Sequence, residues 1–216
     1  MVNYWLIYIF AQNNVDYKYA TAAIERLKKN LTLNTQAFII IFGPTMFSKS
    51  FLFLVSKSHT EVLDYTVGTI GTISTIGKEM NQNKTTKRFI NVVLSKNKNI
   101  DALCFWGHGS GWVIGPWKTK NPPFMTISDF MNLVVKPIKP KFICYDACYM
   151  GSISSLYEHP EFVQVILAAP AFHPYSSVLW TKAFANLDTL STKKDIFKYS
   201  QKITSTKMDR RTMPHP

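Results

Sequence analysis

Short runs of hydrophobic residues alternate along this chain with segments whose hydrophobic positions recur every three or four residues. Such runs are typical of buried strands, and such segments of amphipathic helices. The runs predict strands over residues 4–10, 37–42, 51–56, 101–106, 141–145 and 162–169. The recurring pattern predicts helices that begin near residue 16, over 85–94, from 126 to a stop at Pro137, over 152–157 and over 175–187. This alternation predicts an α/β fold, a three-layer α/β/α sandwich with a mainly parallel central sheet.

The two longest hydrophobic stretches are better explained by strands than by a leader or a membrane span. No basic region precedes residues 4–10, and no small-residue cleavage pattern follows them. The stretch 37–55 is broken by Gly43-Pro44 and by Ser48-Lys49-Ser50, which favours two strands joined by a turn. We therefore expect no membrane span and favour a cytoplasmic location. Residues 66–77 lack a helical period and are interpreted as a loop, with a short strand left open.

Composition bounds the class of protein further. The chain has 216 residues, of which 46% are hydrophobic, and this content excludes a disordered chain because it can bury a real core. We expect one folded domain over residues 1–187 and a basic, weakly ordered tail over residues 188–216. Three cysteines exclude a disulfide scaffold and indicate a reducing compartment.

The charge leaves several partners open. With 25 Lys and Arg against 13 Asp and Glu, the net charge is +12. Six basic residues lie within 78–98 and eight from residue 182 onward. Nucleic acid or another acidic surface could account for this excess, and so could solubility alone. Nucleic-acid binding is not favoured, because the aromatic residues lie mainly in the predicted strands and no nucleic-acid-binding motif is present.

Two of the predicted strands are followed directly by residues with reactive side chains. The strand 101–106 is followed by Gly107-His108-Gly109, and the strand 141–145 by Asp146-Ala147-Cys148. The carboxyl ends of parallel strands meet at one edge of a sheet, so neighbouring strands would bring the imidazole and the thiol together. A cysteine activated by histidine attacks carbonyl carbon, and the glycines leave N–H groups available for an oxyanion.

The same residues could instead have purely structural roles. A cysteine at a strand end is usually a small buried hydrophobe, as expected for Cys104 and Cys144, and a histidine in a glycine-rich turn is usually solvated. A metal site is not expected, because Cys144 and Cys148 have no second pair of ligands with zinc spacing.

The two motifs together resemble those of the clostripain-like cysteine peptidases, which have a caspase-like fold. The resemblance is carried by LCFWGHGSGW at residues 103–112 and FICYDACYMG at residues 142–151. The opening WLIYIFAQNN at residues 5–14 is similar to the first strand and turn of that family. The resemblance extends from about residue 4 to about residue 180.

This resemblance implies a cysteine endopeptidase that acts through an acyl-enzyme thioester on a protein or peptide substrate. By position, Cys148 is implied as the nucleophile and His108 as the catalytic histidine that protonates the leaving amine. The backbone N–H groups of Gly109 and Cys148 are implied as the oxyanion hole. Asp146 is implied at the floor of the S1 pocket, where it would pair with Arg or Lys. Asp146 could instead cap the helix that begins near Ser152.

The resemblance also suggests self-processing in the loop after the histidine. Residues 117–123 form a polar loop with two prolines, and Lys118 or Lys120 is the candidate cleavage site. An ordinary basic surface loop is the alternative. The chain has no acidic loop with the spacing of a calcium cage, so we expect no calcium requirement and no cofactor.

Two further alternatives concern the whole chain. It could be a catalytically silent caspase-like scaffold that keeps both dyad residues. No strand is predicted after residue 187, so the C-terminal edge of the sheet could be truncated or completed by a second copy. A homodimer along that edge is therefore left open.

Overall fold

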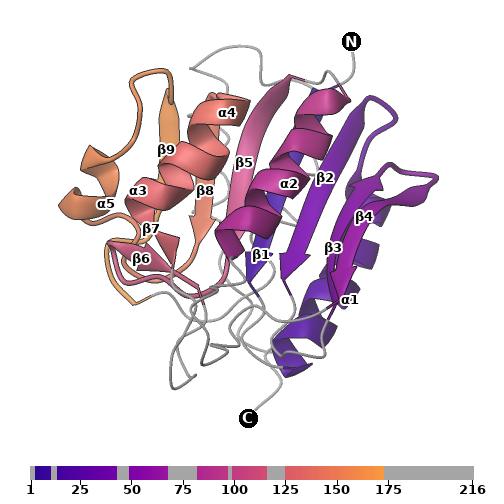
Figure 1. The fold of residues 1–216 in the computed structure, drawn as a ribbon, viewed down its shortest axis with the longest axis horizontal. Coiled ribbons are helices and arrows are strands. Elements are labelled where there is room, and N and C mark those ends of the chain that lie inside the picture. The colour runs from indigo at the N-terminus through magenta and orange to yellow at the C-terminus, as the bar shows by residue number, and fades with distance from the viewer. Residues whose placement is uncertain are drawn as a thin grey trace.

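The protein is described here by a computed structural model, which covers residues 3–10, 14–42, 49–67, 82–96, 99–115 and 125–172. Seven strands form one sheet in the order β4-β3-β2-β1-β5-β8-β9, and helices lie on both of its faces (Figure 1). The large-sheet strands are β1 (Asn3–Phe10), β2 (Thr35–Phe42), β3 (Lys49–Val55), β4 (Thr60–Val67), β5 (Ile100–Trp106), β8 (Phe142–Asp146) and β9 (Val165–Ala168). Two short strands, β6 (Val113–Ile114) and β7 (Met125–Thr126), pair separately.

The helices connect and cover these strands. They are α1 (Asn14–Asn30), α2 (Gln82–Ser95), α3 (Ile127–Phe130), the π-helical turn η1 (Met131–Val135), α4 (Lys136–Ile138) and α5 (Ile153–Tyr157). β2, β1, β5, β8 and β9 are parallel, whereas β3 and β4 extend the sheet as antiparallel strands. The predicted α/β/α sandwich with a mainly parallel sheet is therefore confirmed.

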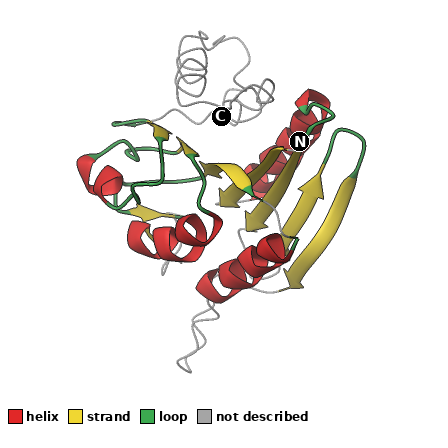
Figure 2. Cartoon of the chain, turned by 90° about the horizontal axis from the view of Figure 1, so that it is seen from above, coloured by secondary structure: helices red, strands yellow, loops and turns green. Residues whose placement is uncertain are grey.

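The two faces of the sheet carry separate hydrophobic clusters. Trp5, Ile7 and Ile9 of β1 pack with Ile24 and Leu27 of α1 on one face. On the other face, aromatic rings of β1 and β5 pack against the helices α2 and α3, as in the edge-to-face pair of Tyr8 and Phe130. Seen from above, the sheet lies between the two helical layers (Figure 2). Burial on both faces explains why the central strands are continuous hydrophobic runs and not alternating ones.

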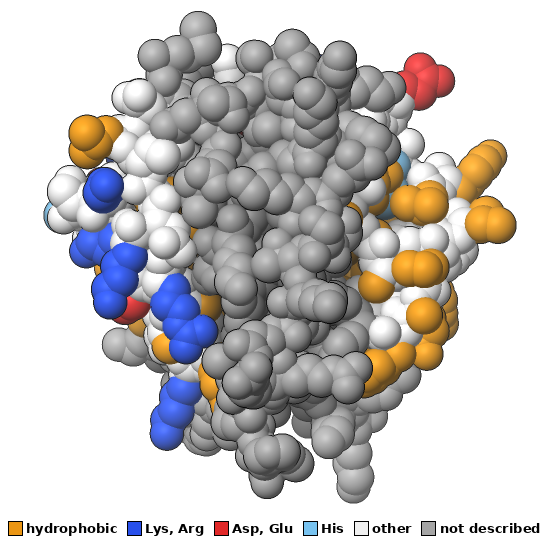
Figure 3. All heavy atoms as spheres, turned by 180° about the vertical axis from the view of Figure 1, so that it is seen from behind, with side chains coloured by type: hydrophobic (Ala, Val, Ile, Leu, Met, Phe, Trp, Pro, Cys, Tyr) orange, Lys and Arg blue, Asp and Glu red, His pale blue; other side chains and the backbone are white. Residues whose placement is uncertain are grey.

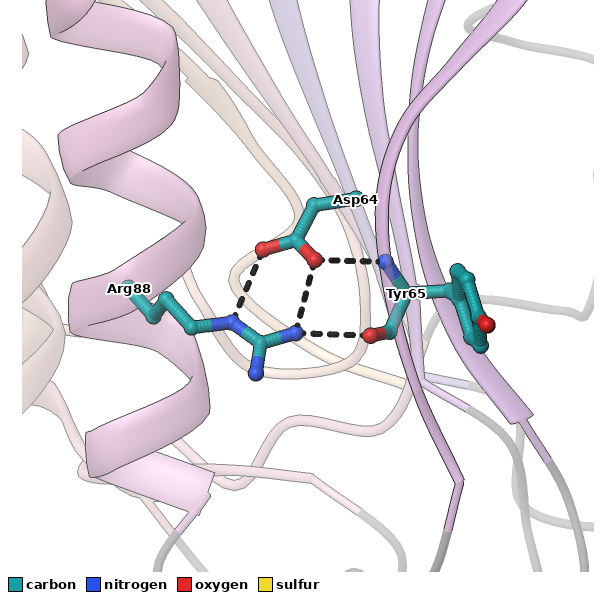
Figure 4. Close-up of polar contacts among 3 residues, drawn as sticks. All are labelled: Asp64, Tyr65 and Arg88. Atoms are coloured by element: carbon teal, nitrogen blue, oxygen red, sulfur yellow. Dashed lines mark hydrogen bonds and ion pairs between the residues drawn. The ribbon is translucent and has the colours of Figure 1, made fainter.

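The helix α2 is fastened to the edge strand β4 by one side chain. The guanidinium of Arg88 donates from Nη2 to Oδ1 of Asp64 at 2.9 Å, and its Nε lies 2.8 Å from Oδ2 (Figure 4). The same Nη2 donates to the carbonyl of Tyr65 at 2.7 Å. This bidentate contact holds α2 against β4, the outermost strand on that side of the sheet.

Three features differ from the pattern-based expectations. β4 is not predicted, because a register shift opposite Leu52 and Phe53 breaks the alternation that would reveal it. The helix does not stop before Pro137: it continues to Ile138 and ends at Lys139, which has a left-handed φ of 50°. The proline lies near the C-terminal end of this continuous helix, directly after the π-helical turn, and its missing N–H removes one hydrogen bond there.

The third difference is the length of β9. The expected strand 162–169 is reduced to Val165–Ala168, because a turn closed by the N–H of Val163 and the carbonyl of Pro160 precedes it. The expected helix 175–187 and the expected tail 188–216 lie outside the described residues. In the part of the chain that is described, no helix has the length and hydrophobicity needed to cross a membrane.

Candidate active site

The ends of β5 and β8 bring the two predicted reactive residues to one edge of the sheet. Trp106 and Asp146 are register partners, and the N–H of Gly107 donates to the Asp146 carbonyl at 3.4 Å. His108 and Cys148 each follow their strand's last residue by two positions. The pairing therefore places the imidazole and the thiol on adjacent loops, and both residues are half-buried.

The two loops are in close contact at Gly109. A Cβ atom at this position would lie 2.6 Å from the carbonyl oxygen of Cys148 and 2.7 Å from Sδ of Met150. Gly109 faces Ile114 in an antiparallel bridge whose hydrogen bonds are made by the flanking residues. The N–H of a residue in such a non-hydrogen-bonded pair points away from the partner strand. Glycine is thus required for the close approach, and its N–H is directed away from β6.

The loop after the cysteine is fixed on its other side by the segment after β9. The N–H of Tyr149 donates to the carbonyl of Ala171 at 3.0 Å, and the N–H of Gly151 donates to that of Ala169 at 2.8 Å. Tyr149 adopts a left-handed φ of 59°, which a non-glycine residue rarely adopts. The three loops therefore keep the order of their strands, with the cysteine loop in the middle.

A second contact joins the histidine loop to α5. The carbonyl of Gly111 accepts from Oγ of Ser152 at 3.5 Å and from Oγ of Ser154 at 3.3 Å. Gly111 has a φ of 90°, and a Cβ there would lie 2.6 Å from the Ser152 oxygen. Ser152 is also the N-cap of α5, where its oxygen accepts from the N–H of Ser155 at 3.4 Å. The structure thus assigns the α5 cap to Ser152, and the expectation that Asp146 might cap this helix is not confirmed.

Asp146 is the last residue of β8 and is 3% exposed. Strand alternation places it on the α1 face, together with Cys144. Cys104 and Cys144 are register partners on that face and both are buried, as predicted. Burial, a hydrogen bond that the Cys104 thiol donates to Cys144, and the negative charges of Cys144 and Asp146 raise the pKa of the Cys104 thiol well above its usual value. Among the three cysteines, Cys148 is the one that solvent reaches.

A partly buried hydrogen-bond chain, which the sequence pattern does not predict, supports this part of the molecule. The hydroxyl of Tyr145 and Nε2 of His159 lie 2.8 Å apart, and Nδ1 of the same ring lies 2.8 Å from the Ser155 carbonyl. Since a carbonyl only accepts, Nδ1 carries the hydrogen and Nε2 accepts from the tyrosine. Burial lowers the pKa of His159, against the opposing effect of its hydrogen bonds, and burial raises that of Tyr145.

Other predicted positions are not placed. Lys118 and Lys120 lie outside the described residues. Within the described ranges, no group of three or more His, Cys, Asp or Glu side chains could hold a metal ion.

Comparisons with known proteins give a family match and structural neighbours. The model of the clostripain family (peptidase C11) matches residues 7–213. A secreted C11 cysteine protease from Bacteroides thetaiotaomicron, solved with an irreversible peptide inhibitor, superposes with a TM-score of 0.67 at 16% identity. The match covers 93% of this chain and 58% of that one. A second structure of a secreted C11 protease from this organism, called iotapain, has a TM-score of 0.55 at 15% identity and covers 80% and 53%.

At these identities the structural neighbours establish the fold alone. The chain spans a little over half the length of these neighbours. No curated protein matches the chain significantly.

Proposed function

This chain belongs to the clostripain family, and on that premise we propose that it is a cysteine endopeptidase with Cys148 as nucleophile and His108 as general acid. The observation that carries the proposal is the pairing of β5 with β8, which brings the Gly109 backbone against the Cys148 carbonyl. One loop thus offers an acid and the other a thiol, and the Gly109 backbone lies against the cysteine loop. A structural neighbour with the same fold was solved with an irreversible peptide inhibitor, which is consistent with a peptide substrate.

We propose a reaction in two stages. The Cys148 thiolate attacks the carbonyl carbon of the scissile bond, and the carbonyl electrons move onto oxygen. The N–H groups of Gly109 and Cys148 stabilise that oxyanion. When it collapses, the C–N bond breaks, His108 gives its proton to the leaving amine, and a thioester to Cys148 remains. Water then attacks the thioester, so that the acid product and the free thiol are released.

Asp146 is proposed to select a basic residue on the amino side of the scissile bond. It is the last residue of β8, two residues before the proposed nucleophile. A buried carboxylate attracts a guanidinium strongly and can bind it bidentately. We therefore propose cleavage after Arg or Lys.

Self-processing is a further part of the proposal. The candidate sites Lys118 and Lys120 follow the histidine loop in sequence and are basic, as the proposed pocket requires. Intact-mass measurement of the purified chain should show fragments that end at one of these lysines. The same fragments in the Cys148→Ala variant would mean that another protease made them.

The test of the peptidase itself is a panel of peptides that differ only in the residue before the scissile bond: Arg, Lys, Asn, Asp or Gly. We expect hydrolysis after Arg and Lys, and none by Cys148→Ala. His108→Gln should lose amide hydrolysis more than hydrolysis of the matched methyl ester, because an alkoxide leaves with less need of a proton than an amine. Activity of Cys148→Ala on these peptides would refute the mechanism.

A further inference from the structure

Large hydrophobic side chains are exposed around the proposed site. Trp112 is 67% exposed although it lies only four residues after His108. Ile153, the first residue of α5, is 86% exposed. Figure 3 shows most of the visible hydrophobic side chains on one side of the molecule and lysine and arginine side chains on the other. Exposed apolar side chains grouped on one side indicate a binding surface more strongly than scattered ones do.

The backbone on both sides of the Trp112 amide group is held in place. The Gly111 carbonyl accepts hydrogen bonds from two serines of the α5 N-terminus. The Trp112 carbonyl accepts from the N–H of Ile127 at 2.9 Å. A rigid backbone that presents an exposed indole loses little conformational freedom when a ligand covers the ring. The contacts of Gly111 also bring the backbone of Trp112 close to the start of α5, where Ile153 lies.

The proposed chemistry determines which part of a substrate passes over Trp112. The general acid must come within hydrogen-bond reach of the leaving nitrogen, so the leaving group lies on the side of His108. The cysteine loop separates this side from the segment after β9. A peptide bound across Cys148 therefore directs its leaving half toward the histidine loop, which continues into Trp112.

We propose that Trp112, together with Ile153, forms a subsite for apolar side chains in the first two positions after the scissile bond. This inference rests on the proposed peptidase function and extends it from the residue before the bond to those after it. The substrate class is then a peptide with a basic residue followed by one or two hydrophobic residues. Burial of an indole against such side chains supplies the selectivity.

The test uses internally quenched peptides with the same acyl half ending in Arg and either Leu-Phe or Ser-Asn after it. The methyl ester of the same acyl half reports on the nucleophile without any residue after the bond. We expect the wild type to prefer Leu-Phe about tenfold in kcat/KM. Trp112→Ala should reduce this preference to about twofold or less, and Trp112→Phe should retain most of it. Ile153→Ser should also reduce the preference for Leu-Phe. Because Ile153 is exposed, this replacement should leave the fold intact.

Leu33→Ala is the matched control. Leu33 is 83% exposed and precedes the amino end of β2. The candidate site lies at the carboxyl ends of the parallel strands, so replacement of Leu33 should keep the wild-type preference. A preference that survives both Trp112→Ala and Ile153→Ser overturns the subsite while peptidase activity stands. So does an equal loss on the methyl ester and on both peptides. A wild-type chain that hydrolyses neither ester nor peptide refutes the peptidase function, and the subsite with it.

Discussion

Cys148 differs from the other two cysteines in its place in the fold. Cys104 and Cys144 face each other across two strands inside the core, where burial keeps the Cys104 thiol protonated. Cys148 lies beyond the strand end, half-buried, with its carbonyl against Gly109. At the scale of single residues, the proposed activity depends on this position and on the carboxylate two residues before it.

The role of Asp146 gives a sharp prediction. Replacing it with Asn keeps the size of the side chain but removes the charge, so a bound guanidinium loses its ion pair. We expect kcat/KM for a peptide with Arg before the scissile bond to fall roughly 30-fold, which corresponds to a loss of about 2 kcal/mol in transition-state stabilisation. The matched peptide with Gln at that position should change much less. An equal loss on both peptides would show that Asp146 supports the fold and not the selectivity.

Some of these residues could be predicted from the sequence and others could not. His108 and Cys148 stand out because each ends a hydrophobic run, and such runs predict strands whose ends meet at one edge. The left-handed conformation of Tyr149 has no signal in the sequence, since tyrosine rarely adopts it. The close approach at Gly109 depends on a contact with Cys148, 39 positions later in the sequence, which no local pattern reveals.

At the scale of elements, α5 connects the parts of the site. Its N-cap serine contacts the histidine loop, and its C-terminal end is anchored on β8 through His159 and Tyr145. The strands were predictable because both faces of the sheet are buried. β4 and the π-helical turn were not, because a register shift and a change of helical period each disrupt the pattern that predicts them.

The anchor of α5 predicts a pH dependence of stability. His159 is neutral in the folded state, and burial places its pKa below the unfolded value of about 6.5. Below that pH the unfolded chain binds more protons, so the free energy of unfolding falls as pH falls toward the folded pKa. His159→Gln keeps a donor and an acceptor without the titration. Urea unfolding from pH 7 to about pH 5 should therefore show a steeper loss for the wild type, and parallel curves would contradict the anchor.

The Arg88 contact with β4 predicts a loss of stability without a loss of activity. Arg88→Ala should lower the free energy of unfolding by about 0.5–1 kcal/mol, a modest value because the two side chains are 48% and 24% exposed. Arg88→Lys should recover only part of this, since an ammonium cannot make the bidentate contact. Denaturant unfolding measures both. Because the contact is at the far edge of the sheet from the candidate site, kcat/KM should stay at the wild-type value.

At the scale of the whole molecule, the lysine and arginine side chains of α1 lie away from the candidate active site. The net charge is +12, and Figure 3 shows lysine and arginine side chains on the side of α1, away from the exposed hydrophobic side chains. The proposed pocket therefore binds a basic residue through one local carboxylate within a repulsive long-range field.

This arrangement predicts an unusual salt dependence. Raising the ionic strength from 0.01 M to 0.1 M shortens the screening length from about 30 Å to about 10 Å. The long-range repulsion of a basic peptide is then screened, whereas the buried contact with Asp146 is screened less. We expect kcat/KM for the Arg peptide to rise roughly twofold and that for the neutral Gln peptide to stay constant. A fall with salt for the Arg peptide would show attractive steering instead.

The central claim is that Cys148 is the nucleophile, and the three cysteines of the chain allow a direct measurement. The chain is treated with a peptidyl ketone electrophile that ends in Arg, and the modified residue is located by peptide mapping. The account predicts one adduct per chain, on Cys148, with hydrolysis lost in proportion to labelling and no adduct in Cys148→Ala. An adduct on Cys104 or Cys144, or hydrolysis that persists in Cys148→Ala, would contradict it.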